Sequence, residues 1–235
     1  MINVIVLLAG EGKRFKDANY VLPKPLIPIN GKPMITRAIE SLDIEGRYCF
    51  VVRKDEHLSQ TLDAIKQVVT DPVIVEVDKI TEGAAASALL LEQHIDPDSE
   101  LIIVNCDQIM NWESEHAIKC LRKFDGALVT IKSTDPKHSF ARVENRLVTE
   151  VVEKNPISDC ALTGIHYWNR AEYFFSSAKQ MIQNNDRTNN EFYVGPTYNY
   201  LINDGLDIGM YEITGHEFYP VGTPNDLERY LNESK

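Results

Sequence analysis

The chain has 235 residues, of which 43% are hydrophobic and 25% charged, so it can bury a sizeable core like an ordinary globular protein. Its formal net charge of −11 argues against a general nucleic-acid binder, because such proteins carry a basic stripe or patch. The overall charge still allows a local cluster of Lys and Arg that binds an anionic small molecule.

The cysteines are spread along the chain and form no CxxC pair: Cys49, Cys106, Cys120 and Cys160. Because most of them lie in apolar runs, we expect buried thiols in a reducing compartment. The run Val4–Ala9 is too short for a signal peptide, and no segment reaches the ~18 apolar residues that a membrane span requires. We therefore expect a cytoplasmic protein with neither a nucleic-acid nor a membrane partner.

Short runs rich in Val and Ile alternate with helix-like stretches in the first part of the chain. These runs show no clean alternation of apolar and polar residues, which favours strands buried on both faces of a sheet. Their alternation with helices predicts βαβ units and a mainly parallel sheet. The expected strands are Val4–Ala9, Cys49–Val52, Val73–Val77, Leu101–Cys106 and Ala127–Ile131, and the expected helices are Pro33–Leu42, His57–Val69, Glu82–Gln93 and Ser114–Phe124.

The pattern changes after about residue 135, where strand candidates follow one another before two further helices. We expect strands at Phe140–Val143, Leu147–Val152, Leu162–Trp168 and Gly209–Ile213, and helices at Arg170–Gln183, Thr197–Ile202 and Pro224–Leu231. The predicted architecture is α/β, with a mainly parallel mixed sheet flanked by helices and a small β-rich lobe. We expect one domain over residues 1–235, with a first half over 1–134 and a second half over 135–235.

The first strand runs directly into LAGEGKRF, in which Gly10 and Gly12 are followed by Lys13 and Arg14. Glycines can adopt φ > 0 and present backbone N–H groups to phosphate oxygens, and neighbouring cations add charge-assisted hydrogen bonds. The glycine spacing fits neither the P-loop nor the dinucleotide-binding fingerprint. The loop alone is also compatible with an ordinary tight turn between a strand and a helix.

The continuation KPLIPINGKPMI supplies Lys24, a short strand, a turn at Asn30–Gly31 and the start of a helix. Together, LAGEGKRF and KPLIPINGKPMI resemble the signature of nucleotidyltransferases that activate sugar 1-phosphates, and of related cytidylyltransferases. The resemblance implies the nucleotide-diphospho-sugar transferase fold, which is Rossmann-like. It also implies an enzyme that joins a nucleoside monophosphate to a phosphorylated acceptor and releases pyrophosphate.

The resemblance assigns roles to the residues of this segment. Leu8, Ala9 and Gly10 would border the base and ribose, Gly12, Lys13 and Arg14 would hold the phosphates that leave as pyrophosphate, and Lys24 would bridge the reacting phosphates. Attack of a phosphate on a nucleoside triphosphate brings two polyanions together, so positioning and charge neutralisation carry most of the catalysis.

The segment TEGAAASALL contains a potential helix start, with Thr81 as the expected cap and small residues after it. In the resembling family a corresponding Gly- and Ala-rich helix start packs against the base, which maps to Gly83 and Ala84. The alternative is a helix that uses small residues only to pack closely on the sheet. The narrow slot implied by the resemblance favours a pyrimidine nucleotide, with CTP slightly ahead of UTP and dTTP.

The strand LIIVNCDQIM places Asp107 at its carboxyl edge, where ligands bind in open α/β sheets. By the resemblance this aspartate would hold the Mg²⁺ that bridges the triphosphate. Many relatives carry a second aspartate at the position of Pro220, whose side chain cannot bind a metal. Asp226 or Glu191 would then supply the second ligand, or Mg²⁺ would be completed by phosphates and water.

The acceptor side resembles the family more loosely. The segment EVVEKNPIS places Lys154 for the acceptor phosphate, LTGIHYW places Gly164 against the acceptor, and NNEFYVGP places Glu191 near acceptor hydroxyls. His166 is interpreted as a structural member of its strand rather than a base. Tyr167 and Trp168 are candidates for a cation–π contact with a cationic acceptor.

A sugar 1-phosphate is the first choice of acceptor, in a pathway of polysaccharide biosynthesis. The alternatives are a CTP-dependent cytidylyltransferase that uses a phosphocholine-like or amino-acid-derived phosphate, and a regulatory module that binds nucleotides without catalysis. A glycosyltransferase of the same fold is disfavoured, because NCDQ has one aspartate where a paired-aspartate motif is expected. A homo-oligomer is compatible with the sequence.

Overall fold

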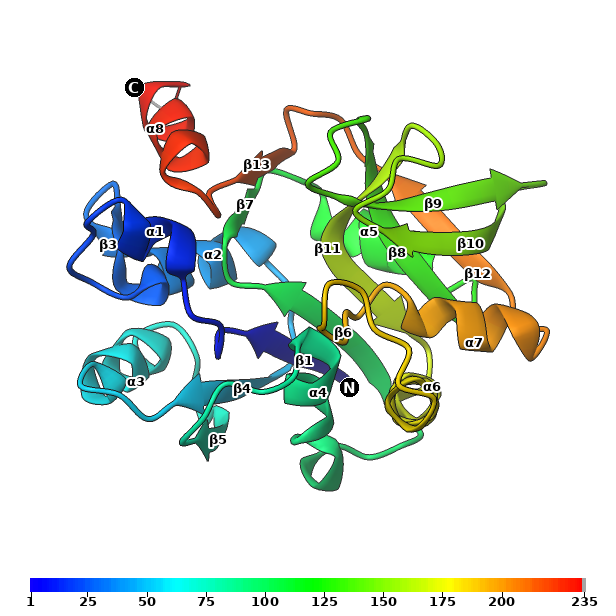
Figure 1. The fold of residues 1–235 in the computed structure, drawn as a ribbon, viewed down its shortest axis with the longest axis horizontal. Helices are drawn as coiled ribbons and strands as arrows, with labels where there is room; N and C mark the ends of the chain where they lie inside the picture. Colours follow the sequence, from blue (N-terminus) through cyan, green and yellow to red (C-terminus); the bar gives the residue numbers. More distant parts are fainter. Residues whose placement is uncertain (234–235) are drawn as a thin grey trace.

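A nine-stranded sheet forms the centre of the computed structural model, which describes residues 1–233 (Figure 1). Seven strands follow the order β10-β9-β11-β6-β1-β4-β5, and β8 pairs with both β11 and β12. The strands of this sheet are β1 (Ile2–Leu7), β4 (Arg47–Arg53), β5 (Val73–Val77), β6 (Glu100–Asn105), β8 (Gly126–Lys132), β9 (Ser139–Glu144), β10 (Leu147–Glu153), β11 (Cys160–Trp168) and β12 (Ile208–Glu212).

Four parallel strands make up the N-terminal part of the sheet. Strand β1 lies between β6 and β4, and Leu7 is in register with both Asn105 and Val51. The carboxyl ends of these strands therefore meet at one edge. Strand β11 then runs antiparallel to β6 and starts the second part of the sheet. The structure confirms the predicted α/β class with helices flanking the sheet, whereas the division near residue 134 stays a prediction.

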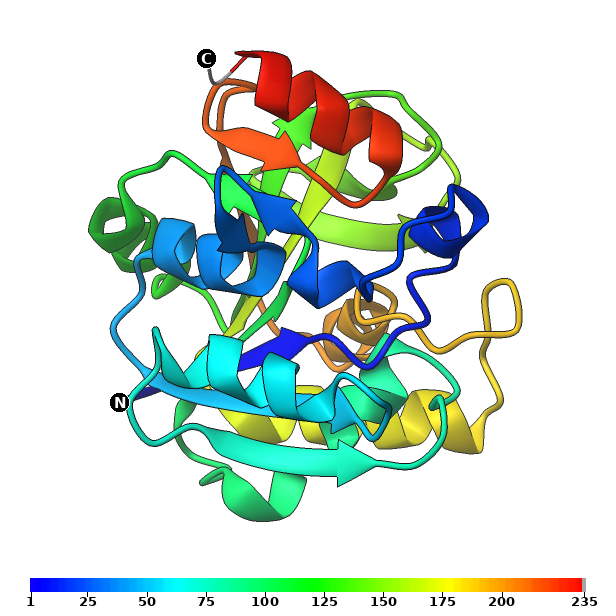
Figure 2. The same ribbon diagram turned by 90° about the vertical axis from the view of Figure 1, so that its left-hand side faces the viewer.

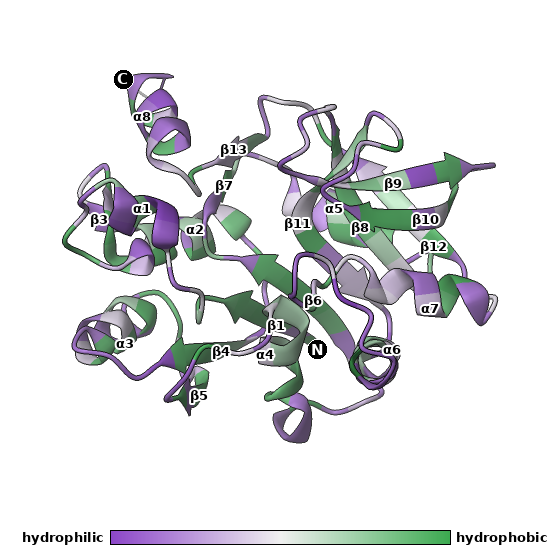
Figure 3. Cartoon of the chain, in the orientation of Figure 1, coloured by the Kyte–Doolittle hydropathy of each residue, from purple (hydrophilic) through white to green (hydrophobic). Residues whose placement is uncertain are grey.

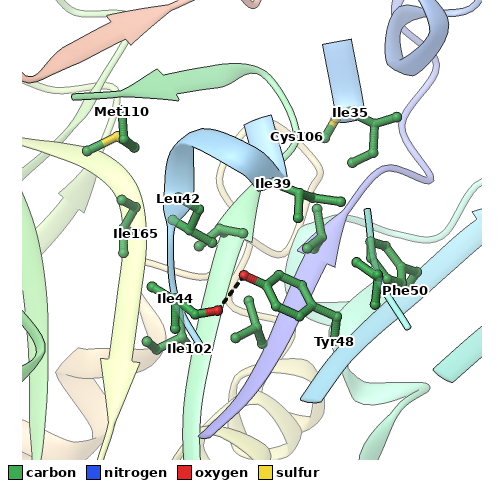
Figure 4. Close-up of a cluster of buried hydrophobic side chains, with 14 of the residues drawn as sticks. Ile35, Ile39, Leu42, Ile44, Tyr48, Phe50, Ile102, Cys106, Met110 and Ile165 are labelled. Carbon is green, nitrogen blue, oxygen red and sulfur yellow. Dashed lines mark hydrogen bonds between the residues drawn. The ribbon is translucent and has the colours of Figure 1, made fainter. Parts of the chain in front are cut away.

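Helices cover both faces of the sheet because neighbouring residues of a strand point to opposite faces. Val4 and Val6 pack with α2, α3 and α5, whereas Ile5 packs with α4, α6 and α7. Figure 3 shows the apolar character of β1 and β6 between these layers, and Figure 4 shows Ile35 and Ile39 of α2 in the first cluster. The helices are α1 (Lys13–Asp17), α2 (Met34–Leu42), α3 (Leu58–Lys66), α4 (Ala84–Leu89), α5 (Ser114–Leu121), α6 (Ala171–Gln183), α7 (Thr197–Asn203) and α8 (Pro224–Glu233), with short 3₁₀ turns at η1 (Lys24–Leu26) and η2 (Glu92–His94).

A third apolar cluster joins the two ends of the chain. Figure 2 shows helix α8 (red) above the hairpin (blue) of β2 (Pro28–Ile29) and β3 (Lys32–Pro33). Ile29 of the hairpin, Phe15 of α1 and Leu227 of α8 are buried in this cluster. Two short strands, β7 (Gln108–Met110) and β13 (Phe218–Pro220), pair beside it. The C-terminal segment is thereby held against the residues that follow Asp107.

Several predicted boundaries are wrong for local reasons. The first strand ends at Leu7, and the helix predicted over Glu82–Gln93 is divided into α4 and the η2 turn. The helix predicted over Pro33–Leu42 begins at Met34, and Pro33 precedes it as the N-cap residue with an extended ψ of 144°. The short elements α1, β7 and β13 were not predicted, because three to five residues carry no clear periodicity. The turn at Asn30–Gly31 is confirmed, with φ of 47° and 81°.

The cysteines behave as the sequence indicates. Cys49, Cys106 and Cys160 are buried, Cys120 is partly exposed, and all four are free thiols. Burial raises the pKa of the Cys106 thiol to about 11, so the thiol is uncharged near neutral pH. Within residues 1–233 there is no helix with the length and hydropathy needed to cross a membrane.

Tyr198 provides a test of how α7 is fixed to the sheet. Its buried hydroxyl accepts a hydrogen bond from the Tyr167 N–H and lies 3.1 Å from the carbonyl oxygens of Tyr167 and Ala127. Tyr198→Phe removes the hydroxyl that these backbone groups contact. We therefore expect the free energy of unfolding to fall by about 1–2 kcal/mol. Guanidinium denaturation measures this change.

The matched control is Tyr200→Phe on the same helix, whose hydroxyl donates to the exposed Asp186 carboxylate at 3.2 Å. A change below about 0.5 kcal/mol is expected for this surface site. Equal losses for the two variants would contradict the structural role of the Tyr198 hydroxyl.

Candidate functional site

A cavity of about 490 Å³ opens at the edge where the parallel strands β1 and β6 end. Its wall is formed by residues from both halves of the chain and contains basic, acidic and aromatic side chains. It is lined by Leu7, Arg14, Lys24, Ala84, Asn105, Asp107, Lys137, His138, Ser139, Glu153, Lys154, Leu162, Thr163, Gly164, His166, Glu191, Tyr193, Val194 and Gly195. Three cations predicted from the sequence, Arg14, Lys24 and Lys154, therefore share one cavity with the predicted metal ligand Asp107.

The glycine-rich loop follows β1 and leads into the short helix α1. Gly12 has φ of 62° and is the N-cap of α1, whereas Gly10 is not among the residues with positive φ. A Cβ at Gly12 would lie 3.1 Å from the Lys24 Cβ, so the missing side chain allows the loop and η1 to approach closely. Arg14 reaches the cavity, and Lys13 is exposed outside its lining.

The predicted base-binding residues are only partly at this cavity. Leu8 and Ala9 are buried in opposite apolar clusters, and it is Leu7, which was not predicted, that lines the wall. Leu8 and Gly10 instead border a small recess of about 20 Å³ that also contains Lys24. The strand ends at Leu7, two residues earlier than predicted, and neither Leu8 nor Ala9 lines the cavity.

An ion pair joins Lys24 and Asp107, which are 83 residues apart in the chain. The Lys24 Nζ donates to the Asp107 Oδ2 at 2.6 Å, and both side chains are roughly one-fifth exposed, at 21% and 23%. Burial on its own would lower the pKa of Lys24, but the Asp107 carboxylate outweighs it and raises this pKa. Lys24 is therefore a charged ammonium at neutral pH, held beside the carboxylate at the end of β6.

The C-terminal segment forms the support behind Asp107. The Val221 N–H donates to the Asp107 carbonyl oxygen at 2.9 Å, and a Cβ at Gly222 would lie 2.2 Å from the Asp107 Oδ2. Pro220 pairs with Gln108 across the two short strands, directly beside the aspartate. The position predicted for a second aspartate is thus adjacent to Asp107, but it carries a side chain with no metal-binding atom.

The two candidates for a second ligand differ in their placement. The Asp226 carboxylate accepts a hydrogen bond from the Thr223 Oγ1 at 2.7 Å and pairs with Lys137 at 3.5 Å, outside the cavity lining. Glu191 does line the cavity. Residues 1–233 contain no cluster of three His, Cys, Asp or Glu side chains arranged for a metal. The donor set fits a hard cation that takes one carboxylate from the protein and further oxygens from phosphate and water.

The start of α4 packs tightly against the loop before α7. Gly83 has φ of 133°, and a Cβ there would lie 2.5 Å from the backbone N and O of Phe192. The Phe192 N–H donates to the Glu82 carbonyl, and the Phe192 carbonyl accepts from the Ala85 N–H. Gly83 is the N-cap residue, so the prediction that Thr81 caps this helix is wrong. Packing explains the small residue at position 83, while Ala84 lines the cavity.

Lys154 lies on the acceptor side predicted from the sequence, at the end of β10. Its φ is 55°, a left-handed conformation that is uncommon for lysine, and its N–H donates to the His138 carbonyl at 3.1 Å. The Lys154 ammonium donates to the Tyr193 hydroxyl and lies 4.5 Å from the centre of that ring. Tyr193 and the backbone turn therefore hold the ammonium in the cavity beside Glu191.

Gly164 lies in an irregular part of β11. It has φ of 90°, and the register between β11 and β8 shifts between Leu162 and His166. A Cβ at Gly164 would lie 2.3 Å from the Asn105 Nδ2, so only glycine allows β11 to approach this side chain. Such irregularities re-aim side chains next to sites.

Some cavity residues were missed by the sequence analysis. Asn105, Lys137, His138 and Glu153 all line the wall. Burial raises the pKa of Glu153, against the hydrogen bond that its carboxylate accepts from Ser139. The NCD and EK segments already contained Asn105 and Glu153, whereas no pattern marked the other two. Tyr167 and Trp168 are buried and do not line the cavity, so their predicted cation–π role is wrong.

Comparisons with known proteins agree with this arrangement. A family model described as nucleotidyl transferase matches residues 3–233. UTP–glucose-1-phosphate uridylyltransferase of Haloferax volcanii is 27% identical over 238 residues, covering 97% of this chain and 94% of the relative. Bifunctional protein GlmU of Methanocaldococcus jannaschii is 27% identical over 175 residues, covering 72% of this chain and 40% of that longer relative.

The fold is also similar to that of a solved structure. The crystal structure of the nucleoside-diphosphate-sugar pyrophosphorylase of Vibrio cholerae superimposes with a TM-score of 0.85 and 24% sequence identity. The match covers 99% of this chain and all of the other. At this identity the likeness shows a shared fold.

The close contact at Gly83 generates a test of this part of the site. Gly83→Ala would place a methyl group against the Phe192 backbone at a φ that alanine rarely adopts, so we expect the free energy of unfolding to fall by about 2–4 kcal/mol. Gly10→Ala is the control, because a Cβ there meets no atom within 4 Å. Chemical denaturation of both variants measures the difference. Similar stabilities would show that the loop around Phe192 does not depend on glycine.

Proposed function

The chain belongs to the nucleotidyl transferase family, and we propose that it transfers a nucleoside monophosphate from a nucleoside triphosphate to a sugar 1-phosphate, with release of pyrophosphate. The observation that carries the proposal is the meeting of Arg14, Lys24, Asp107 and Lys154 in one cavity at the carboxyl edge of the sheet. These residues come from separate segments of the chain. Three cations that meet in one cavity are suited to binding the phosphate groups of two substrates.

In the proposed reaction a phosphate oxygen of the acceptor attacks the α-phosphorus of the triphosphate. A new P–O bond forms, the bond from the α-phosphorus to the bridging oxygen breaks, and its electron pair leaves with pyrophosphate. The phosphate monoester is already an anionic nucleophile, so the step needs little general-base assistance. Catalysis then depends on bringing the two anions together and on stabilising the charge of the leaving group.

Each cation of the cavity is assigned to one of the phosphate groups according to its position in the chain. Arg14, after the glycine loop, is assigned to the phosphates that leave, and Lys24 to the reacting phosphates. Lys154, which is held by the Tyr193 hydroxyl and ring, is assigned to the acceptor phosphate. Glu191 and Gly164 are assigned to the rest of the acceptor, since both line the same cavity as Lys154.

A divalent cation, which we propose to be Mg²⁺, would be held by the Asp107 carboxylate and would neutralise triphosphate charge when bound. Lys24 already occupies one oxygen of that carboxylate at 2.6 Å. Its ammonium is thus placed to move between the carboxylate and a phosphate oxygen. Glu191 is the candidate for a second ligand among the acidic side chains of the cavity, because Glu153 accepts a hydrogen bond from Ser139; Asp226 is engaged with Thr223 outside the cavity lining.

The nucleotide base is assigned to the slot beside Ala84, with Gly83 behind it, and a pyrimidine is proposed. The named activity of the Haloferax volcanii relative supports both a pyrimidine nucleotide and a sugar 1-phosphate. UTP and CTP differ in the hydrogen bonds that their edges offer. A base whose edge does not match the site would leave buried hydrogen-bonding groups unpaired, and each unpaired group would cost about 1–3 kcal/mol of binding free energy. CTP stays the prediction from the sequence, and UTP is its direct competitor.

Pyrophosphate release tests the proposal when each of CTP, UTP, dTTP, ATP and GTP is combined with a panel of phosphorylated acceptors. The panel includes glucose 1-phosphate, N-acetylglucosamine 1-phosphate, mannose 1-phosphate and phosphocholine. We expect turnover that requires Mg²⁺, a pyrimidine nucleotide and a sugar 1-phosphate. Turnover restricted to phosphocholine would select the cytidylyltransferase alternative, and nucleotide binding without turnover would select a regulatory module.

The same assay tests the roles of the cations. Arg14→Ala and Lys24→Ala are each expected to lower turnover by roughly 10²–10³, the scale seen when one preorganised charge-stabilising group is lost. Lys32→Ala is the control, because Lys32 is exposed on the hairpin, pairs with Glu40 of α2 and lies outside the cavity lining. Near-normal pyrophosphate release by the Arg14 and Lys24 variants would remove the phosphate-binding assignment.

A further inference from the structure

His166 lies in the wall of the cavity without a part in the reaction described so far. It is 7% exposed and its ring is stacked with those of Tyr198, at 5.8 Å between centroids, and Trp168, at 6.0 Å. The irregular pairing of β11 beside Gly164 brings this residue to the cavity, which it lines together with Thr163.

The imidazole has no hydrogen-bond partner within residues 1–233. Its Nδ1 is buried and unpaired, and its Nε2 is likewise unpaired but is not enclosed by protein atoms. A buried polar atom without a partner costs about 1–3 kcal/mol, and a phenyl ring would fill the same stack without this cost. If the ring served only to pack in the wall, an imidazole would therefore be less stabilising than a phenyl ring.

The charge state of His166 limits what it can bind. Burial lowers the pKa of this imidazole to about 3, so the ring is neutral near pH 7. A neutral imidazole offers one N–H donor and one nitrogen acceptor. Phosphate groups are better matched by the cations Arg14, Lys24 and Lys154, which line the same cavity. A quaternary ammonium has no N–H to donate and gains no hydrogen bond from His166.

A hydroxyl group matches this site because it can both donate to and accept from an uncharged imidazole. We propose that His166 binds a hydroxyl of the acceptor and thereby selects a polyhydroxylated phosphate over acceptors that lack this group. The proposal rests on the proposed function, since it assigns the acceptor to the part of the cavity between His166 and Lys154. His166 is a specificity residue in this account, and it takes no proton in the reaction.

The test compares glucose 1-phosphate with its 2-, 3-, 4- and 6-deoxy analogues, using the nucleotide that supports turnover. For the unchanged protein we expect one analogue to lose about tenfold in kcat/KM, the effect of one hydrogen bond to an uncharged group. In His166→Phe that selectivity should disappear, while KM for the nucleotide stays the same. His166→Gln, which keeps an uncharged hydrogen-bonding group, should restore part of the selectivity.

Two further measurements separate a binding role from a structural one. The ¹⁵N signals of the His166 imidazole should shift when glucose 1-phosphate is added, and His116→Phe, at an exposed position, should leave the analogue selectivity unchanged. Unchanged selectivity in His166→Phe together with active transfer to glucose 1-phosphate would overturn the proposal and leave the proposed function intact. An absence of transfer to every sugar 1-phosphate would overturn the proposed function and this inference with it.

Discussion

The ion pair between Lys24 and Asp107 is the interaction around which the candidate site is built. Two charged groups at 2.6 Å with only about a fifth of their side chains exposed are costly to desolvate and are stable only as partners. Gly12 allows Lys24 to approach, and Val221 and Gly222 hold Asp107 from behind. In the proposed function, a phosphate group would replace Asp107 as the partner of Lys24, and a cation would replace Lys24 as the partner of Asp107.

The sheet explains why these groups meet. Strands β1 and β6 are parallel neighbours with ends in register, so the loops after Leu7 and Asn105 emerge side by side. The antiparallel strand β11 then brings the second half of the chain across the same edge, with Gly164 against Asn105. Lys154 faces the cavity from that half. In the proposed function, a nucleotide bound by the first part of this sheet and an acceptor bound by the second would meet at this edge.

Features encoded locally were predicted well from the sequence. Runs of Val and Ile predicted the central strands, and the position of Asp107 after such a run placed it at the carboxyl edge of the sheet, where the cavity opens. Contacts between distant segments were not predictable. The pairing of Lys24 with Asp107, the contact of Phe192 with Gly83 and the unpaired nitrogen of His166 all depend on tertiary packing. Strand β1 ends two residues earlier than predicted, and Leu8 and Ala9 are buried outside the cavity lining, so their predicted role beside the base stays a prediction.

The most direct measurement follows the α-phosphate of a labelled pyrimidine nucleotide in the presence of Mg²⁺ and a sugar 1-phosphate, with Asp107→Asn compared against Asp78→Asn. Asp78 is 79% exposed and lies away from the cavity lining, so it controls for the loss of one carboxylate. The account predicts that the label enters the acceptor with one pyrophosphate released per transfer, and that Asp107→Asn loses this activity while remaining folded. Normal transfer by Asp107→Asn, or release of the label to water without an acceptor, would contradict it.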